Sequence, residues 1–156
     1  MDIIALLSPD RISCNQEITS KKRAFERLAQ LLSRGQEQIS SDDIFEALMN
    51  REKLGCTALG SGVAIPHARL PIAHPRAAIL SLTNGVDLDA PDKKAVTVLI
   101  GILMPEEVSE GDSQMLFELT GLLSKKSFIK NLCCYQEPSV IIDYFNSFCN
   151  KDLIAA

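Results

Sequence analysis

The strongest constraint on the fold is the segment from Val96 to Met104, VTVLIGILM, which is nearly all apolar and β-branched in its first half. A strand that is buried on both faces has this continuous apolar pattern, because neither face meets water. No apolar run in the chain approaches the roughly 20 residues that a membrane-spanning helix needs. We therefore expect residues 96–104 to form a central strand, and we expect no membrane insertion.

Helical periodicity lies on both sides of this segment, with short strand candidates between. Helices are expected at residues 20–33, from Ser40 or Ser41 onward, at 112–125 and from Pro138 onward, with a short turn at 128–132. Further strands are expected at 63–65, ending at Pro66, and at 77–82, with a Gly-rich loop over 55–62. This order predicts a single α/β domain over residues 1–156.

Composition narrows the function classes. The chain carries 16 Lys and Arg against 20 Asp and Glu, has no Trp and has two Tyr, which does not fit a nucleic-acid binder. Its first residues, MDIIA, have no basic segment of the kind that opens a secretory signal. Its five cysteines include no Cys-x-x-Cys pair, so reduced thiols are expected. Together these features predict a cytoplasmic protein.

The two histidines, His67 and His74, are the first candidates for chemistry. Imidazole is a common metal ligand, so a shared metal site is one interpretation. Prolines at 66, 71 and 75 argue against one continuous helix through both positions, so the spacing does not imply that the rings face each other. No cysteine or acidic pair with ligand spacing lies nearby. The sequence therefore predicts neither a metal nor a cofactor.

A nucleophilic role suits His67 better, because imidazole is both a nucleophile and a leaving group. A phosphoryl group on this ring would need donors around it. Gly60 and Gly62 would allow backbone N–H groups to approach closely, and Arg51 and Arg69 could bind phosphate oxygens. From spacing alone, an ordinary loop histidine after a strand remains the alternative.

One longer motif decides between these interpretations. The segment from Arg51 to His67, REKLGCTALGSGVAIPH, closely resembles the active-site motif of type-2 EIIA domains of the bacterial phosphotransferase system. This is the mannitol/fructose class, and the stand-alone nitrogen-related EIIA proteins are its most similar members. The resemblance extends to LLSPDRI at residues 6–12 and to the apolar strand that ends at LMP, residues 103–105.

The resemblance implies a fold and a function. The family fold is a mixed β-sheet flanked by α-helices on both faces. His67 would be phosphorylated on Nε2 by the phosphocarrier HPr or by its nitrogen-branch counterpart NPr. Arg51 would help to hold the phosphoryl group, with Thr57, Gly60 and Gly62 in the same active-site loop. Transport members pass the phosphoryl group to an EIIB cysteine, whereas nitrogen-type members regulate other proteins.

The chain departs from the family pattern in two places. Cys56 and Ala58 stand where the family usually has Ser and Gly. The family also carries a second histidine after the apolar strand, and Asp112 occupies that position here. A carboxylate there could orient an imidazole by accepting its N–H, but it would also repel a phosphoryl dianion. Alternatively, Asp112 caps the helix that follows.

These observations predict a phosphocarrier of the nitrogen-regulatory type, a phosphotransferase component rather than a metabolic enzyme. The chain ends at Ala156 with no fused EIIB or membrane domain, which favours regulation. One alternative is a binding module that has kept the fold and lost phosphotransfer. Two others are a sugar-specific EIIA serving a separate permease, and a hydrolase that uses Cys56 and His67.

Overall fold

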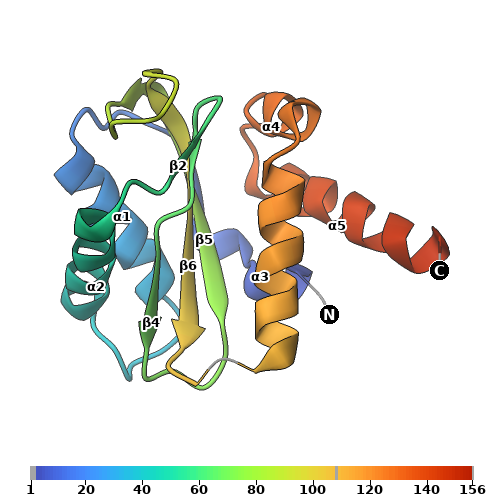
Figure 1. Ribbon diagram of the computed structural model, residues 1–156, viewed down its shortest axis with the longest axis horizontal. Helices are drawn as coiled ribbons and strands as arrows, with labels where there is room; N and C mark the ends of the chain where they lie inside the picture. The colour runs from blue at the N-terminus through green and yellow to red at the C-terminus, as the bar shows by residue number, and fades with distance from the viewer. Residues whose placement is uncertain (1–2, 108, 156) are drawn as a thin grey trace.

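The protein is built as a β-sheet between two layers of helices (Figure 1). The computed structural model describes residues 3–107 and 109–155, with side chains described over 5–107 and 109–148. One layer holds α1 (Lys21–Ser33) and α2 (Ser41–Leu54); the other holds α3 (Glu110–Leu123), α4 (Lys126–Leu132) and α5 (Pro138–Ala155). This arrangement confirms the predicted α/β class, with helices on both faces of a mixed sheet.

The sheet is organised around one central strand. Its strands are β1 (Ile12–Gln16), β2 (Ala58–Gly60), β3 (Val63–Ala64), β4 (His67–Leu70), β5 (Arg76–Val86) and β6 (Val96–Pro105). Their order is β1-β5-β6-β3-β2, and β4 also pairs with β6. β5 runs antiparallel to β6, whereas β3 and β4 run parallel to it. Every residue of β6 except Thr97 is buried, which confirms the expected central strand.

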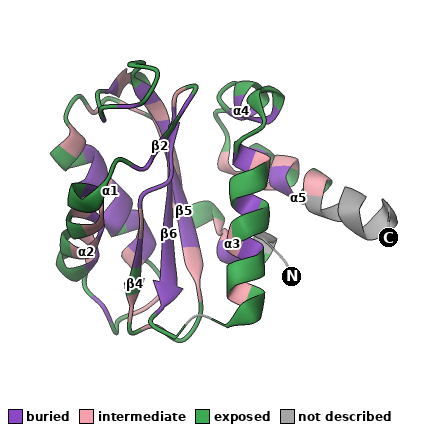
Figure 2. Ribbon diagram, in the orientation of Figure 1, coloured by how far each residue is buried: buried purple, intermediate pink, exposed green. Residues whose placement is uncertain are grey.

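Alternate residues of β6 face two separate apolar cores. Leu99 and Leu103 pack on the α1 and α2 side, while Ile100 and Ile102 pack on the side of α3, α4 and α5. This alternation follows from the two-residue period of a strand. Figure 2 shows the buried residues concentrated on the sheet and on the helix faces that cover it.

Serine caps begin the first two helices, and the cap at Ser40 was predicted from the sequence. The side chain of Ser20 accepts a hydrogen bond from the backbone N–H of Arg23, and Ser40 does the same for Asp43. Each bond satisfies a donor that the helix itself leaves unpaired. Short 3-10 helices, η1 (Ile3–Leu6) and η2 (Pro9–Arg11), precede β1. Among the described residues, no helix is long and apolar enough to cross a membrane.

Three strands differ from the sequence prediction. β2 lies inside the segment expected to be a loop, β4 follows Pro66 where the strand was expected to end, and β1 was not expected. β1 is the polar sequence ISCNQ, and β4 carries two charged or titratable side chains in four residues. Neither has a strong local strand pattern, so their pairing partners β5 and β6 determine these strands.

Gly101, in the middle of β6, provides a test of the packing on the α1 side. A Cβ atom at this position would lie 2.8 Å from Cγ of Leu28, which is fully buried on α1. We expect Gly101→Ala to lower the free energy of unfolding by about 1–3 kcal/mol through overpacking, measured by urea denaturation. Gly121→Ala is the control, since a Cβ there meets nothing within 4 Å and alanine favours the helix. Equal stability of the Gly101→Ala variant and the parent would contradict the described packing.

Candidate functional site

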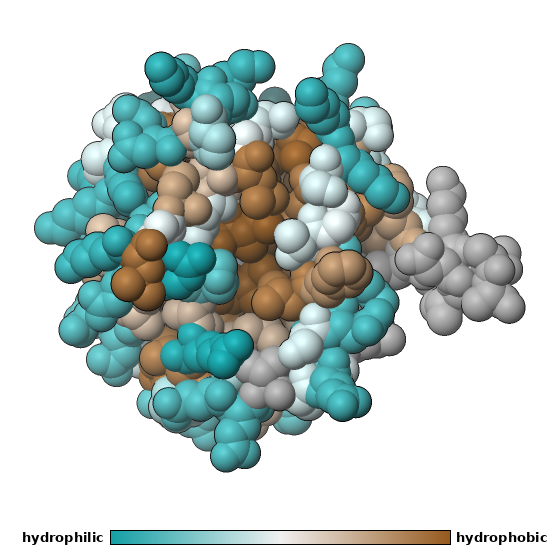
Figure 3. Space-filling view, viewed as in Figure 1, coloured by the Kyte–Doolittle hydropathy of each residue, from teal (hydrophilic) through white to brown (hydrophobic). Residues whose placement is uncertain are grey.

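A hollow opens at the sheet edge formed by β4, between α2 and α3. Its volume is about 750 Å³. Figure 3 shows it as a concentration of hydrophobic side chains in the middle of the face, bordered on both sides by hydrophilic ones. The lining residues come from α2, β4, the end of β6 and α3: Ala47, Asn50, Arg51, Leu54, His67, Ala68, Arg69, Met104, Ser113, Leu116, Phe117 and Thr120.

His67 lines this cavity as the first residue of β4. Its side chain is half-buried, and its Nδ1 lies 2.8 Å from the backbone oxygen of Ile65. A carbonyl oxygen can only accept a hydrogen bond, so Nδ1 carries the proton and donates it. In that tautomer the lone pair is on Nε2. The ring therefore presents Nε2 as its nucleophilic atom.

The backbone around His67 is held on two sides. The backbone N–H of Ile65 donates to the oxygen of Thr57, and the oxygen of Pro66 accepts from the N–H of Ile102 on β6. Pro66 lacks an N–H, but it lies at the sheet edge where no neighbouring strand requires that donor. Because of this arrangement the chain continues past Pro66 as a strand, and His67 is a strand residue rather than a loop histidine.

Arg51 and Arg69 bring positive charge to the same cavity. Arg69 pairs with Met104 and His67 pairs with Ile102, so both face the α3 side of the sheet. Arg51 lies in the last turn of α2, where its Nη1 donates to the backbone oxygen of Gly55 at 3.0 Å. A guanidinium has five N–H donors, so this bond leaves others for a ligand. The cavity can thus bind an anion beside His67.

The two glycines of the motif do not reach this cavity. Gly60 and Gly62 have φ angles of +91° and +85° and form the turn between β2 and β3. β3 pairs with β6 at Val98, whereas His67 pairs with it four residues further on, a separation of roughly 13 Å along a strand. Neither glycine lines the cavity. Their conformational freedom serves the turn, so the expected glycine cradle for phosphate is not brought to His67.

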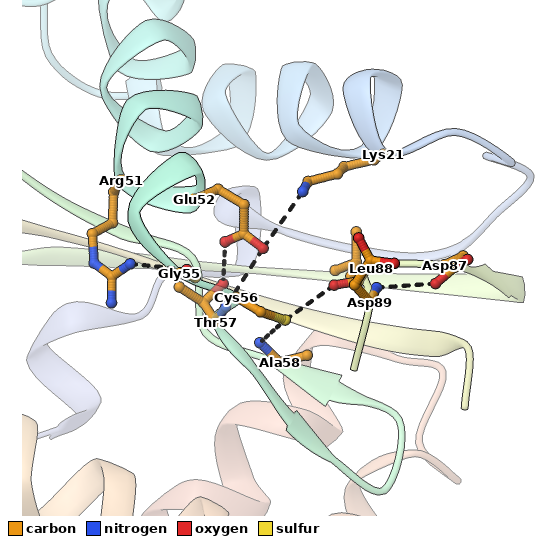
Figure 4. Close-up of polar contacts among 10 residues, drawn as sticks. All are labelled: Lys21, Arg51, Glu52, Gly55, Cys56, Thr57, Ala58, Asp87, Leu88 and Asp89. Carbon is orange, nitrogen blue, oxygen red and sulfur yellow. Dashed lines mark hydrogen bonds and ion pairs between the residues drawn. The ribbon is translucent and has the colours of Figure 1, made fainter. Parts of the chain in front are cut away.

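Thr57 and Cys56 make other contacts. Thr57 is buried, and its hydroxyl donates to Oε2 of Glu52 at 2.7 Å (Figure 4). The Sγ atom of Cys56 lies 3.0 Å from the backbone oxygen of Leu88. Neither residue lines the cavity. The structure therefore does not bring Cys56 together with His67, as the hydrolase hypothesis requires, and it gives the Thr57 hydroxyl a protein partner.

Asp112 lies in the first turn of α3, next to the cavity-lining Ser113. It does not cap the helix as one interpretation held, because the cap is Ser109, whose side chain accepts from the backbone N–H of Asp112 at 3.0 Å. Asp112 is half-buried and does not itself line the cavity. Its carboxylate suits the positive end of the helix dipole.

His74 lies outside the cavity, exposed in the segment between β4 and β5. The structure therefore separates it from the residues gathered around His67. Within the described part of the chain, no group of three or more His, Cys, Asp or Glu side chains is arranged to hold a metal ion.

Two apolar residues of the cavity wall were not predicted from the sequence. Leu54 ends α2 and is 85% exposed, and Phe117 on α3 is 77% exposed. Large apolar side chains this exposed, on opposite walls of one hollow, are typical of a protein-binding surface. Phe117 falls outside the buried positions of α3, which are Met115, Leu119 and Leu123. This mismatch with the helical period is the sequence signal that could have identified it.

Residues 5–148 match the protein family described as phosphoenolpyruvate-dependent sugar phosphotransferase system, EIIA 2. The chain belongs to this EIIA type-2 family. The resemblance carried by the motif from Arg51 to His67 is thereby confirmed, and it extends over nearly the whole EIIA domain.

Nitrogen regulatory proteins are among the relatives of this EIIA protein. One from Pseudomonas aeruginosa is 39% identical over 121 residues, covering 77% of the chain and 79% of the relative. A nitrogen regulatory protein homolog from Haemophilus influenzae is 37% identical, covering 85% and 83%. The crystal structure of the nitrogen regulatory protein IIA-Ntr from Neisseria meningitidis superposes with a TM-score of 0.85 at 35% identity, covering 92% of the chain and 98% of that structure.

Proposed function

We propose that this EIIA protein is a phosphocarrier that accepts a phosphoryl group on Nε2 of His67 from HPr or NPr. The Nε2 lone pair attacks phosphorus, and the bond between phosphorus and the donor breaks, with its electron pair staying on the donor. Nδ1 keeps its proton throughout. The positive charge that the ring gains is stabilised by the bond from Nδ1 to the oxygen of Ile65.

The observation that carries this proposal is the orientation of one ring within one cavity. His67 has its Nδ1 occupied and lies with Arg51 and Arg69 in a hollow large enough to admit a partner's phosphorylated side chain. Two guanidinium groups offset the charge of a phosphoryl group, which is about −1.5 to −2. The chain itself therefore supplies both the nucleophile and the countercharge.

The surroundings of the cavity support a protein as the phosphoryl donor. Leu54 and Phe117 extend the apolar surface outward from the site, where a docking protein could bury them. Membership of the EIIA family implies a phosphocarrier protein as donor and an EIIB domain or regulated protein as the next partner. The relatives named nitrogen regulatory proteins favour a regulatory, cytoplasmic role over service to a separate sugar permease.

Phosphorylation by purified components tests the proposal. The protein is incubated with phosphoenolpyruvate, enzyme I and either HPr or NPr, and its intact mass is measured. A carrier gains about 80 Da, the mass of one phosphoryl group, and the adduct is lost in acid. Comparing HPr with NPr identifies the donor. No adduct with either donor would favour a binding module that has kept the fold and lost phosphotransfer, for which Asp112 at the second-histidine position is the supporting observation.

Asp112 is expected to make phosphorylation of His67 less favourable. A carboxylate near a phosphoryl dianion is repulsive by on the order of 1 kcal/mol in a solvated site, which is roughly fivefold in the equilibrium. Asp112→Asn removes the charge, and Asp112→His adds a donor as well, so the level of phosphorylated protein at matched donor potential should rise in that order.

Asp43→Asn is the matched control for this series. Asp43 occupies the same position in α2, with its N–H bonded to the cap Ser40, but it lies at the end of α2 away from Arg51. Asp43→Asn therefore removes a carboxylate from the first turn of a helix without changing the charge beside the cavity. If the parent, Asp112→Asn and Asp112→His reach equal levels, Asp112 acts only on the helix.

A further inference from the structure

Glu52 and Thr57 are the two buried polar or charged side chains of the described residues, 6% and 7% exposed. Burying a carboxylate is costly unless hydrogen bonds compensate for the lost water. Here Oε2 of Glu52 accepts from the Thr57 hydroxyl at 2.7 Å, and Oε1 lies 3.4 Å from the Thr57 backbone nitrogen, which donates to it (Figure 4). The carboxylate of Glu52 therefore accepts hydrogen bonds from both the hydroxyl and the backbone N–H of Thr57.

From Thr57 the hydrogen bonds continue to the imidazole. The backbone oxygen of Thr57 accepts from the N–H of Ile65 at 3.0 Å. The backbone oxygen of Ile65 in turn accepts from Nδ1 of His67 at 2.8 Å. Four residues thus form one connected set of bonds from a buried carboxylate to the ring, although Glu52 and His67 are 15 positions apart in the chain.

The last turn of α2 contributes one residue to the cavity and one to the buried hydrogen bonds. Arg51 lines the cavity, while the adjacent Glu52 is buried against the segment that leads to β2. On the other side, Nζ of Lys21 at the start of α1 lies 3.7 Å from Oε1 of Glu52. The carboxylate is therefore fixed between two helices that form one layer of the fold, and its position is set independently of any ligand.

We infer that Glu52 is a positioning residue for phosphotransfer. Through Thr57 it fixes the backbone oxygen of Ile65, which accepts the hydrogen bond from Nδ1 of His67, and so keeps the ring in the tautomer with a free Nε2. This inference rests on the proposed role of His67, and it gives Thr57 a role in orienting the ring in place of the expected contact with phosphate. If the bond between Glu52 and Thr57 only stabilised the fold, breaking it would not change the tautomer of His67.

The test measures the ring and the transfer separately. In the full-length protein labelled with ¹⁵N, the shifts of Nδ1 and Nε2 of His67 give the tautomer populations before any phosphorylation. The rate of phosphorylation from HPr or NPr is then measured for the same samples. The variants are Glu52→Gln, Thr57→Val and Thr57→Ser. Thr83→Val is the control, since its exposed hydroxyl lies 3.5 Å from the oxygen of Gln16 on the far side of the sheet.

Glu52→Gln and Thr57→Val are expected to lower the population of the Nδ1–H tautomer and to slow phosphorylation by about tenfold. Removing the carboxylate partner of a metal-bound histidine costs about 10- to 100-fold in metal affinity or activity, and we expect the lower end of that range here. Thr57→Ser retains the hydroxyl and should restore both readouts, and Thr83→Val should match the parent. The inference would be overturned if the Glu52→Gln and Thr57→Val proteins fold and show the same His67 tautomer population as the parent. If Thr57→Val does not fold, the result for Glu52→Gln decides alone. Failure of the parent to accept phosphate would instead contradict the proposed function, because the tautomer readout does not depend on transfer.

Discussion

The His67→Ala variant is expected to show no phosphoryl labelling when it is incubated with phosphoenolpyruvate, enzyme I and HPr or NPr. Alanine removes the nucleophile from the cavity, and the guanidinium groups of Arg51 and Arg69 cannot replace it. The loss should be complete, a decrease of at least about a hundredfold in labelled protein, which corresponds to more than about 2.7 kcal/mol in the transfer barrier. Intact mass and acid lability of the adduct provide the measurement.

His74→Ala is the matched control, because it removes the other histidine from an exposed position outside the cavity. This variant should be labelled at the parental rate and level. Thermal unfolding of both variants shows whether either change disturbs the fold. Labelling that persists in a folded His67→Ala protein, or that disappears in His74→Ala, would contradict the assignment of the site.

Arg51 is expected to have the second largest effect. Its guanidinium lines the cavity and can donate two parallel N–H bonds to phosphoryl oxygens. Charge-assisted hydrogen bonds contribute about 1.5–3 kcal/mol, so Arg51→Ala should slow phosphorylation by about ten- to a hundredfold. Arg51→Lys keeps the charge but not the paired geometry, and an intermediate rate is expected. Initial rates of transfer from the phosphorylated donor measure both variants.

Arg23→Ala is the control for a lost positive charge, since Arg23 is exposed on α1 and does not line the cavity. Its rate should stay close to that of the parent. If Arg51→Ala and Arg51→Lys are phosphorylated as fast as the parent, the guanidinium does not contact the phosphoryl group. Its bond to the oxygen of Gly55 would then be a cap of α2 alone.

The predictable part of the fold was the part with strong local patterns. β6 is a continuous apolar run, and α1 and α2 begin after serine caps and bury apolar faces. β1 was not predicted, because ISCNQ becomes a strand only through its parallel pairing with β5, whose paired residues are 66 or 67 positions away. β4 was not predicted either, because Pro66 reads locally as the end of a strand, whereas at a sheet edge it is tolerated.

The same distinction holds for the candidate site. His67 and Arg51 were identified by a long motif, and the structure brings both to one cavity with Arg69. Gly60 and Gly62 belong to that motif as well, but their distance from His67 depends on the registers of β3 and β4 against β6, which no local pattern specifies. The exposed Leu54 and Phe117 were missed because apolar helix residues are expected to be buried.

The position of the phosphoryl group on the ring tests the central claim most directly. A long-range ¹H–¹⁵N spectrum of the phosphorylated, ¹⁵N-labelled protein, recorded with and without ³¹P decoupling, identifies the ring nitrogen that is bonded to phosphorus. The bond from Nδ1 to the oxygen of Ile65 predicts a single adduct on Nε2 of His67, with the proton still on Nδ1. A phosphoryl group on Nδ1 of His67, or on His74, would contradict this account.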